Sequence, residues 1–256
     1  MTTSVARVRP VAFWRVVFGV VLVAAWWLIA LLVGKNFVPT PPQTFVAAQQ
    51  IVAGGQLPAA TLDTLGIFIA GYVAAALIGI PLGLVMGGVR IFGAALEPYT
   101  DALSAMPRVA FIPLIIVFLG LGPQAKIVIV FLGAVMPIVT NTYAGVLSCD
   151  GELIEMARSA GASDLQIFTK IMFPAALPYI TAGLRIGASL ALINTVVAEL
   201  YTAVKGLGGL LSVYGNSFRM APYFVVVFVL AAVGVLVMQS LKLVERRMDR
   251  WRYHHE

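Results

Sequence analysis

The chain has 256 residues, of which 61% are hydrophobic and only 11% are charged. An ordinary soluble domain is about 45–50% apolar and about 25% charged, so a chain of this length cannot hide its apolar surface from water. The composition excludes a soluble enzyme and predicts an all-α membrane protein. The net charge of +6 is spread over loops and tails, which favours contact with membrane lipids and no nucleic-acid partner.

Six apolar stretches are long enough to cross a hydrocarbon core, which needs about 20 residues of helix. The predicted spans are Ala12–Val33, Leu62–Met86, Pro98–Leu119, Gln124–Leu147, Tyr179–Glu199 and Ala221–Leu241. The first resembles a signal peptide, but its apolar run is too long and no A-x-A site follows it, so we expect it to stay attached. Proline and glycine inside several spans favour a transporter over a rigid anchor.

Lysine and arginine are unevenly distributed between the two sides that these spans define. Eleven lie on the side that carries both termini and the loop 148–178, and four lie on the other side. The positive-inside rule therefore predicts that both termini are cytoplasmic. On the opposite side, residues 34–60 are rich in turn formers, and we expect a short surface connection without a folded domain.

The loop 148–178 is polar and carries its own helix signals. Asp150 is placed to cap a helix whose start is acidic, with Glu152 and Glu155 near its positive end. Gly161 then permits a reversal of the chain. Ser163 and Gln166 form a capping box for a second helix. That helix is predicted to end at Phe173-Pro174 and to present an apolar stripe of Leu165, Phe168, Ile171 and Met172.

Two interpretations of this two-helix loop remain open from the residues alone. Both helices could lie on the membrane surface. Glu152 and Glu155 argue against this, because anionic lipids would repel them. The alternative is a docking element that inserts into a groove on a cytoplasmic partner.

The same loop resembles the EAA loop of ABC importer permeases. That motif reads E-A-A, three residues, G, nine residues and I-x-L-P, and here Glu155, Ala157, Gly161, Ile171 and Pro174 match it without a gap. Two positions depart from the motif and stay apolar, with Met at 156 and Phe at 173.

The resemblance extends to permeases of the nitrate, sulfonate and taurine branch. It rests on the segments PRVAFIPLIIVFLGLG (107–122), ALPYITAGLRIGASLALINTVVAEL (176–200), GLGGLLSVYGNSFRM (206–220) and LVERRMDRW (243–251). It implies a type I importer transmembrane domain at 58–242, with the EAA loop at 148–178 as its coupling helices. Outside this domain lie a tail (1–11), a first transmembrane helix (12–33) and a basic tail (243–256).

The resemblance also implies the partners. Two permease subunits, expected to be a homodimer, would line one path in the cell inner membrane. Two cytoplasmic ATP-binding subunits would each receive an EAA loop, and a periplasmic or lipid-anchored binding protein would deliver the solute. The chain has no G-x-x-x-x-G-K-[ST] sequence, so ATP and Mg are assigned to the partner, and we expect no cofactor and no enzyme activity here. We also expect no metal site.

Two groups of residues are predicted to carry the function. The contact with the ATPase is assigned to Glu155, Ala157, Arg158, Gly161, Ala162, Asp164 and Phe168. The translocation path is assigned to Arg108, Asn141, Arg185, Asn194 and Glu199, because polar groups within spans are costly and mark function. For Asn194, helix packing is an equal alternative, and both arginines could instead snorkel to the interface.

The solute remains open, with a sulfonate, taurine or nitrate expected first and a pyrimidine, vitamin precursor or aromatic acid second. A self-contained secondary transporter would need ionisable groups in the membrane, of which only Arg108, Arg185, Glu199 and Asp101 are candidates. It would also leave the capped loop unexplained. No nucleophile–base pair or metal constellation supports a membrane enzyme, and a pure scaffold would not explain the broken helices.

Overall fold

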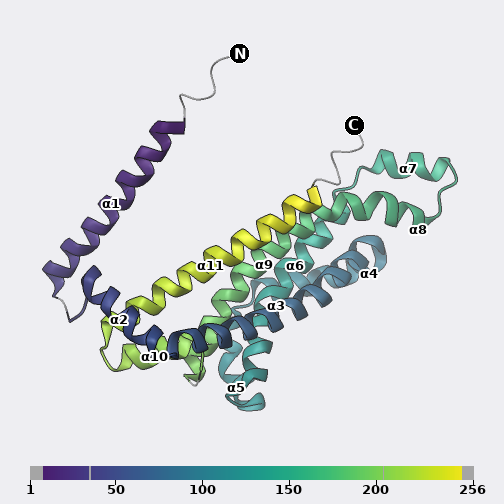
Figure 1. Ribbon diagram of the computed structural model, residues 1–256. Helices are drawn as coiled ribbons and strands as arrows, with labels where there is room; N and C mark the ends of the chain where they lie inside the picture. The colour runs from purple at the N-terminus through teal and green to yellow at the C-terminus, as the bar shows by residue number, and fades with distance from the viewer. Residues whose placement is uncertain (1–7, 35, 204, 250–256) are drawn as a thin grey trace.

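The computed structural model describes residues 8–34, 36–203 and 205–249, and within them every regular element is a helix (Figure 1). The α-helices are α1 (Val8–Val33), α2 (Pro41–Ala53), α3 (Gln56–Gly88), α4 (Arg90–Ala105), α5 (Ile112–Leu119), α6 (Pro123–Leu147), α7 (Gly151–Ser159), α8 (Asp164–Ile167), α9 (Phe173–Thr202), α10 (Leu207–Asn216) and α11 (Met220–Asp249). The tails predicted at 1–11 and 243–256 lie partly outside the described residues, and their described parts continue α1 and α11.

Within the described residues, five helical segments are long and apolar enough to cross a membrane, and a bent pair makes a sixth span if it is counted as one. The prediction of about six transmembrane helices is therefore confirmed. The loop formed by α7 and α8 lies at one end of the helical body, and α2 and α10 lie at the other (Figure 1). We call these the loop end and the α10 end.

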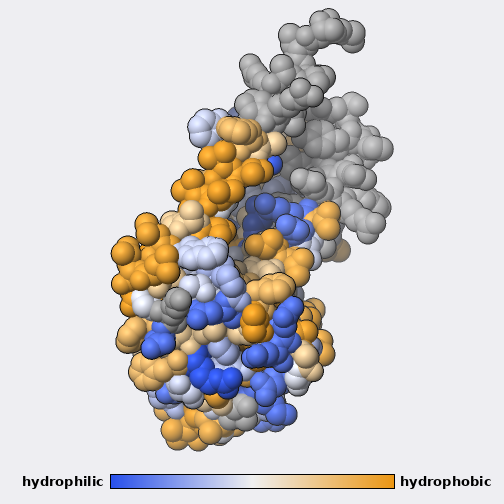
Figure 2. Space-filling view, turned by 60° about the vertical axis from the view of Figure 1, so that its left-hand side comes forward, coloured by the Kyte–Doolittle hydropathy of each residue, from blue (hydrophilic) through white to orange (hydrophobic). Residues whose placement is uncertain are grey.

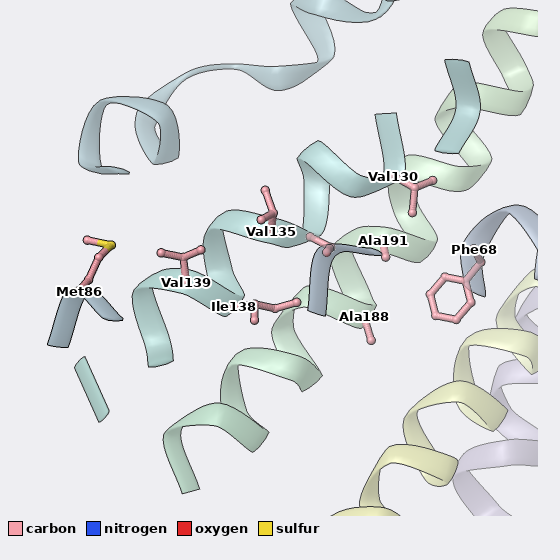
Figure 3. Close-up of a cluster of buried hydrophobic side chains, with 10 residues drawn as sticks. Phe68, Met86, Val130, Val135, Ile138, Val139, Ala188 and Ala191 are labelled. Carbon is pink, nitrogen blue, oxygen red and sulfur yellow. The ribbon is translucent and has the colours of Figure 1, made fainter. Parts of the chain in front are cut away.

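The core lies where α3, α6 and α9 cross. Phe68, Val130, Val135, Ile138 and Ala188 belong to one cluster of buried side chains there (Figure 3). Glycines let the helices approach closely: a Cβ on Gly83 would lie 2.6 Å from the Cβ of Thr142. Small residues at such seams are typical of membrane helices, which pack through close backbone contact because lipid supplies no hydrophobic drive.

The connection expected at residues 34–60 is mostly helical, which the turn formers did not predict. The Thr40 N–H donates to Oε1 of Gln43 at 3.0 Å, so the sequence TPPQ is a capping box that starts α2. Ala47 and Ile51 of α2 then join a buried cluster with Leu211 and Val226. The turn-forming residues therefore start α2, and packing against α10 and α11 stabilises the remainder of this helix.

The third predicted span, Pro98–Leu119, is also corrected. It begins eight residues earlier, at Arg90, and it is broken: α4 and the segment Arg108–Leu119 meet at an angle of 82°. The break falls at Met106, whose backbone is extended, and at Pro107, whose backbone is not helical. Proline disfavours helix in the residue before it, which explains the position of the bend.

The second helix of the 148–178 loop does not end at Pro174 as predicted. α8, a π-helical turn (Phe168–Met172) and α9 form one segment of 39 residues, Asp164–Thr202. Pro174 lies in the first turn of α9, where its missing N–H is least costly, and the wider π turn accommodates the change in hydrogen bonding. Within α8, Ile167 is buried, whereas Leu165 of the predicted apolar stripe is 72% exposed.

Much of the remaining surface is apolar, as a lipid-facing protein requires. Figure 2, in which the side carrying α1, α2 and α10 comes forward, shows hydrophobic residues over large areas with hydrophilic ones gathered between them. α1 has the most exposed side chains of the five spans, and its Trp26 ring stacks on Phe224 of α11 at 6.3 Å.

Candidate functional site

The predicted caps of the 148–178 loop and the reversal at Gly161 are confirmed. The Glu152 N–H donates to Oδ1 of Asp150 at 2.9 Å, which starts α7. The Ser163 N–H donates to Oε1 of Gln166 at 2.9 Å, and the Gln166 N–H donates back to Oγ of Ser163. Between the helices, the Ala162 N–H donates to the Ala157 carbonyl and Gly161 has a φ of +83°. This is a Schellman turn, which requires the left-handed conformation that glycine adopts without strain.

The outer face of the loop is uncovered. Glu155 is exposed, and Met156 and Leu165 are 63% and 72% exposed beside it. Apolar side chains of this size in a polar loop at the end of the body are typical of a surface that a partner covers. Ala157 and Ala162 are half-buried at the turn.

The side chains of Arg158, Asp164 and Phe168 hold the two helices of the loop to each other and to the body. Arg158 Nη2 lies 3.4 Å from Oδ1 of Asp164, an ion pair that joins the two helices but is mostly in solvent. The Phe168 ring lies against Gly88, where an added Cβ would come within 2.8 Å of it. Phe168 thus fixes the loop to the corner between α3 and α4. These contacts favour an internal bracing role for Phe168 over direct contact with a partner.

Asn141 and Asn194 lie in the seam between α6 and α9. Asn141 Nδ2 donates to the Pro137 carbonyl at 2.8 Å, and its Cβ faces Gly183. Asn194 Nδ2 donates to the Leu190 carbonyl at 2.7 Å and lies against Gly133. This placement favours helix packing over contact with a solute for both amides.

The two arginines differ in their surroundings. Arg108 Nη1 donates to the Gly133 carbonyl at 2.9 Å. That carbonyl would normally accept from residue 137, but Pro137 has no N–H, so Arg108 satisfies the acceptor that the proline leaves free. Arg185 is half-buried within α9, and its carbonyl accepts a hydrogen bond from Ser189 Oγ.

Glu199 is fully buried at the α10 end, where it joins three helices. Thr64 Oγ1 of α3 donates to its carboxylate at 2.9–3.0 Å, and the Gly208 N–H of α10 donates to Oε2 at 2.9 Å. The Leu207 N–H donates to Thr64 Oγ1 at 2.8 Å. Two free N–H groups at the start of α10 are thus satisfied by side chains from other helices, and a carboxylate lies at the positive end of its dipole. We call Thr64, Glu199, Leu207 and Gly208 the carboxylate knot.

Sequence reasoning missed Glu97 and named Asp101 only as an ionisable group within a span. Glu97 and Asp101 of α4 are exposed, and Tyr143 of α6 donates its hydroxyl to Oε2 of Glu97 at 3.4 Å. Their spacing of four residues could have shown that both carboxylates share one face, but the span had been placed from Pro98 onward.

A family model described as "Binding-protein-dependent transport system inner membrane component" matches residues 79–250. The chain belongs to this family. It is a multi-pass permease subunit of an ABC importer, as the resemblance of the EAA loop predicted.

Curated relatives agree with this assignment. The taurine transport system permease protein TauC of Escherichia coli (strain K12) is 32% identical over 239 residues, which cover 90% of this chain and 86% of TauC. The riboflavin transport system permease protein RibX of Chloroflexus aurantiacus is also 32% identical, over 232 residues that cover 90% of this chain and 87% of RibX.

Solved structures show the same fold at lower identity. A chain of the MetNI methionine ABC transporter in an inward-facing conformation matches with a TM-score of 0.67 and 22% identity, covering 77% of this chain and 97% of that one. A chain of an amino acid ABC transporter matches with a TM-score of 0.62 and 16% identity, covering 78% and 97%. The predicted type I importer fold is confirmed.

Proposed function

We propose that this permease lines the solute path together with a second copy of itself and receives a cytoplasmic ATPase on the 148–178 loop. The observation that carries the proposal is the loop itself: two separately capped helices at one end of the body, with an exposed face of Glu155, Met156 and Leu165. In this arrangement the loop end and both termini face the cytoplasm, as the distribution of lysine and arginine favours.

The continuous segment Asp164–Thr202 gives the loop a mechanical role. A partner that moves α7 and α8 acts on a helix that runs, without a non-helical break, through the body to the carboxylate knot. Closure of two ATPase subunits around ATP and Mg would therefore rotate or shift α9 within the membrane and alternate the access of the path. The ATP chemistry belongs to the partner.

An external binding protein, periplasmic or lipid-anchored, would deliver the solute to the α10 end. A sulfonate, taurine or nitrate is the first candidate, supported by the similarity to TauC. A vitamin or its precursor is the second, supported by the 32% identity to RibX. Radiolabelled uptake with each solute class in cells that carry the complete importer distinguishes them.

The coupling role is tested by affinity purification of the tagged chain from its native membrane. Wild type should recover an ATPase with a P-loop, and Glu155→Lys should lose it together with ATP-dependent uptake. Glu152→Lys is the matched control, because it makes the same charge change on the same exposed helix. Equal loss from both variants would refute a specific role for Glu155, and ATP-independent uptake by the chain alone would refute the importer mechanism.

A further inference from the structure

Helix α4 has three different faces. Gly93 and Thr100 are buried against the body. A second face is exposed and apolar and consists of Ile91, Phe92, Ala95, Tyr99, Ala102 and Leu103. A third face is exposed and polar and consists of Arg90, Glu97, Asp101 and Ser104. At 100° per residue, the members of this polar face fall within about 60° of one another, on the side of α4 opposite the apolar face.

The polar face lies beside α6. Tyr143 of α6 donates to Glu97, as described above, and Arg108 reaches past the break to the Gly133 carbonyl of α6 while its Nη2 lies 3.5 Å from the Ser104 carbonyl. The polar groups therefore lie along one side of the contact between α4 and α6, from the start of α4 to the bend. Gly93 lies so close to the Met86 carbonyl that an added Cβ would collide with it, and this close approach fixes the position of α4.

This location is incompatible with lipid. α4 and Arg108–Leu119 together have the length and composition of one broken span. Asp101 lies eleven residues into this span, which corresponds to about 16 Å along the helix axis. Charged side chains at membrane depth face protein or water, because hydrocarbon cannot solvate them. The apolar face of α4 can contact lipid, so the polar face must contact protein or water.

A hollow at the loop end opens beside the start of this face. It has a volume of about 810 Å³ and is lined by residues of α3, α4, α6 and the 148–178 loop, among them Arg90, Tyr143 and Arg158. Ile91, at the start of the apolar face, lines it as well, whereas Glu97, Asp101 and Ser104 do not. Tyr143 both lines this hollow and binds Glu97. The hollow, beside the proposed ATPase contact, therefore reaches the polar face of α4 directly at Arg90 and through Tyr143 at Glu97.

We infer that the polar face of α4, with Glu97, Asp101 and Ser104, lines the water-filled part of the solute path between the loop end and the bend at Pro107. This inference rests on the proposed function and adds path residues that differ from the asparagines and Glu199. The face carries two carboxylates and is flanked by Arg90 and Arg108, so a solute would meet both signs of charge along it.

Cysteine accessibility tests the inference directly, because the chain has a single cysteine to remove. In a Cys149→Ser background, Ser104→Cys places a thiol on the polar face, and Ala102→Cys places one on the apolar face of the same helix at the same depth. The complete importer in lipid nanodiscs is treated with a charged, water-soluble methanethiosulfonate. Thiosulfonates react with the thiolate, which forms in water and not in hydrocarbon. We expect Ser104→Cys to react at least about tenfold faster than Ala102→Cys.

Equal rates, a faster reaction of Ala102→Cys, or no reaction of Ser104→Cys would overturn the inference. Glu97→Cys and Ala95→Cys form a second pair if a variant of the first pair does not assemble. Recovery of the ATPase from the same nanodiscs is measured in parallel. An ATPase that is retained beside an unreactive Ser104→Cys refutes only this inference, whereas the absence of an ATPase refutes the proposed function, whatever the thiols do.

Discussion

Each end of the permease has a turn at a glycine with a positive φ, but the surroundings of the two glycines are opposite. At the loop end, Gly161 has a φ of +83°, and a Cβ there would meet nothing within 4 Å. At the α10 end, Gly206 has a φ of +92°, but a Cβ there would collide with the carboxylate of Glu199. One turn is closed by its own local hydrogen bonds and faces outward. The other is closed by side chains of two other helices, Thr64 of α3 and Glu199 of α9.

The difference suits the two proposed roles: the 148–178 loop leaves its outer face exposed for a partner, whereas the carboxylate knot is closed by contacts within the chain. The hydrogen bonds of the 148–178 loop join residues close in sequence, and its outer side chains are exposed. The carboxylate knot joins residues separated by up to 143 positions, and its side chains are buried. We therefore expect changes at the α10 end to lower stability, and changes at the loop end to affect coupling with little effect on stability.

The largest effect is expected for Gly206→Ala. The variant adds a strained positive φ and drives a methyl group into Glu199, and together these should destabilise the protein by about 3 kcal/mol. The apparent melting temperature of the purified protein in detergent measures it, with Gly122→Ala as the control, because a Cβ there is unhindered and its φ is negative. A melting temperature equal to that of the control would contradict the assignment of the knot.

Glu199→Gln should have the next largest effect. The side chain keeps its size, and its amide oxygen can still accept from the Thr64 hydroxyl and the Gly208 N–H, which both donate to Oε2. The loss arises because neutral hydrogen bonds replace charge-assisted ones at the positive end of the α10 dipole, and a hydrogen bond to a charged group contributes about 1 kcal/mol more than a neutral one. Thr64→Ser keeps the hydroxyl and should retain most of the stability in the same melting experiment. A loss for Thr64→Ser as large as that for Glu199→Gln would point to packing and away from hydrogen bonding.

Gly161→Ala should cost about 1 kcal/mol, since only the strained backbone acts and no neighbour is displaced. Its effect on coupling should be larger than this figure suggests, because the Schellman turn sets the angle between α7 and α8. The ratio of ATP hydrolysed to solute imported, measured in proteoliposomes, should rise while the melting temperature changes little. An unchanged ratio would show that the angle does not matter for coupling.

The smallest effect on stability is expected for Asp164→Asn. The side chains of Arg158 and Asp164 are 64% and 91% exposed, so solvent and salt screen their ion pair, and such pairs contribute about 0.5 kcal/mol or less. The melting temperature should match that of wild type at both low and high salt. A clear loss at low salt alone would show that the pair stabilises the loop more than its exposure indicates.

The caps of the 148–178 loop could be predicted because each involves residues two to five positions apart. Asp150 with Glu152, and Ser163 with Gln166, need only their own turn of helix. The same rule applied to Thr40 and Gln43 would have found α2. The turn formers around them obscured that signal. The π turn that merges α8 with α9 has no comparable local pattern, so the end of the second helix was predicted too early.

Composition and local spacing alone determined that this protein is a helical membrane protein with about six spans and a capped two-helix loop, because lipid and the helix period act on each segment separately. Only the tertiary structure decided what the polar residues of the spans do. Asn141 and Asn194 fill a seam, Arg108 satisfies the carbonyl freed by Pro137, and Glu199 holds the start of α10. A polar side chain in lipid needs a partner, and which partner it finds depends on which helices come together.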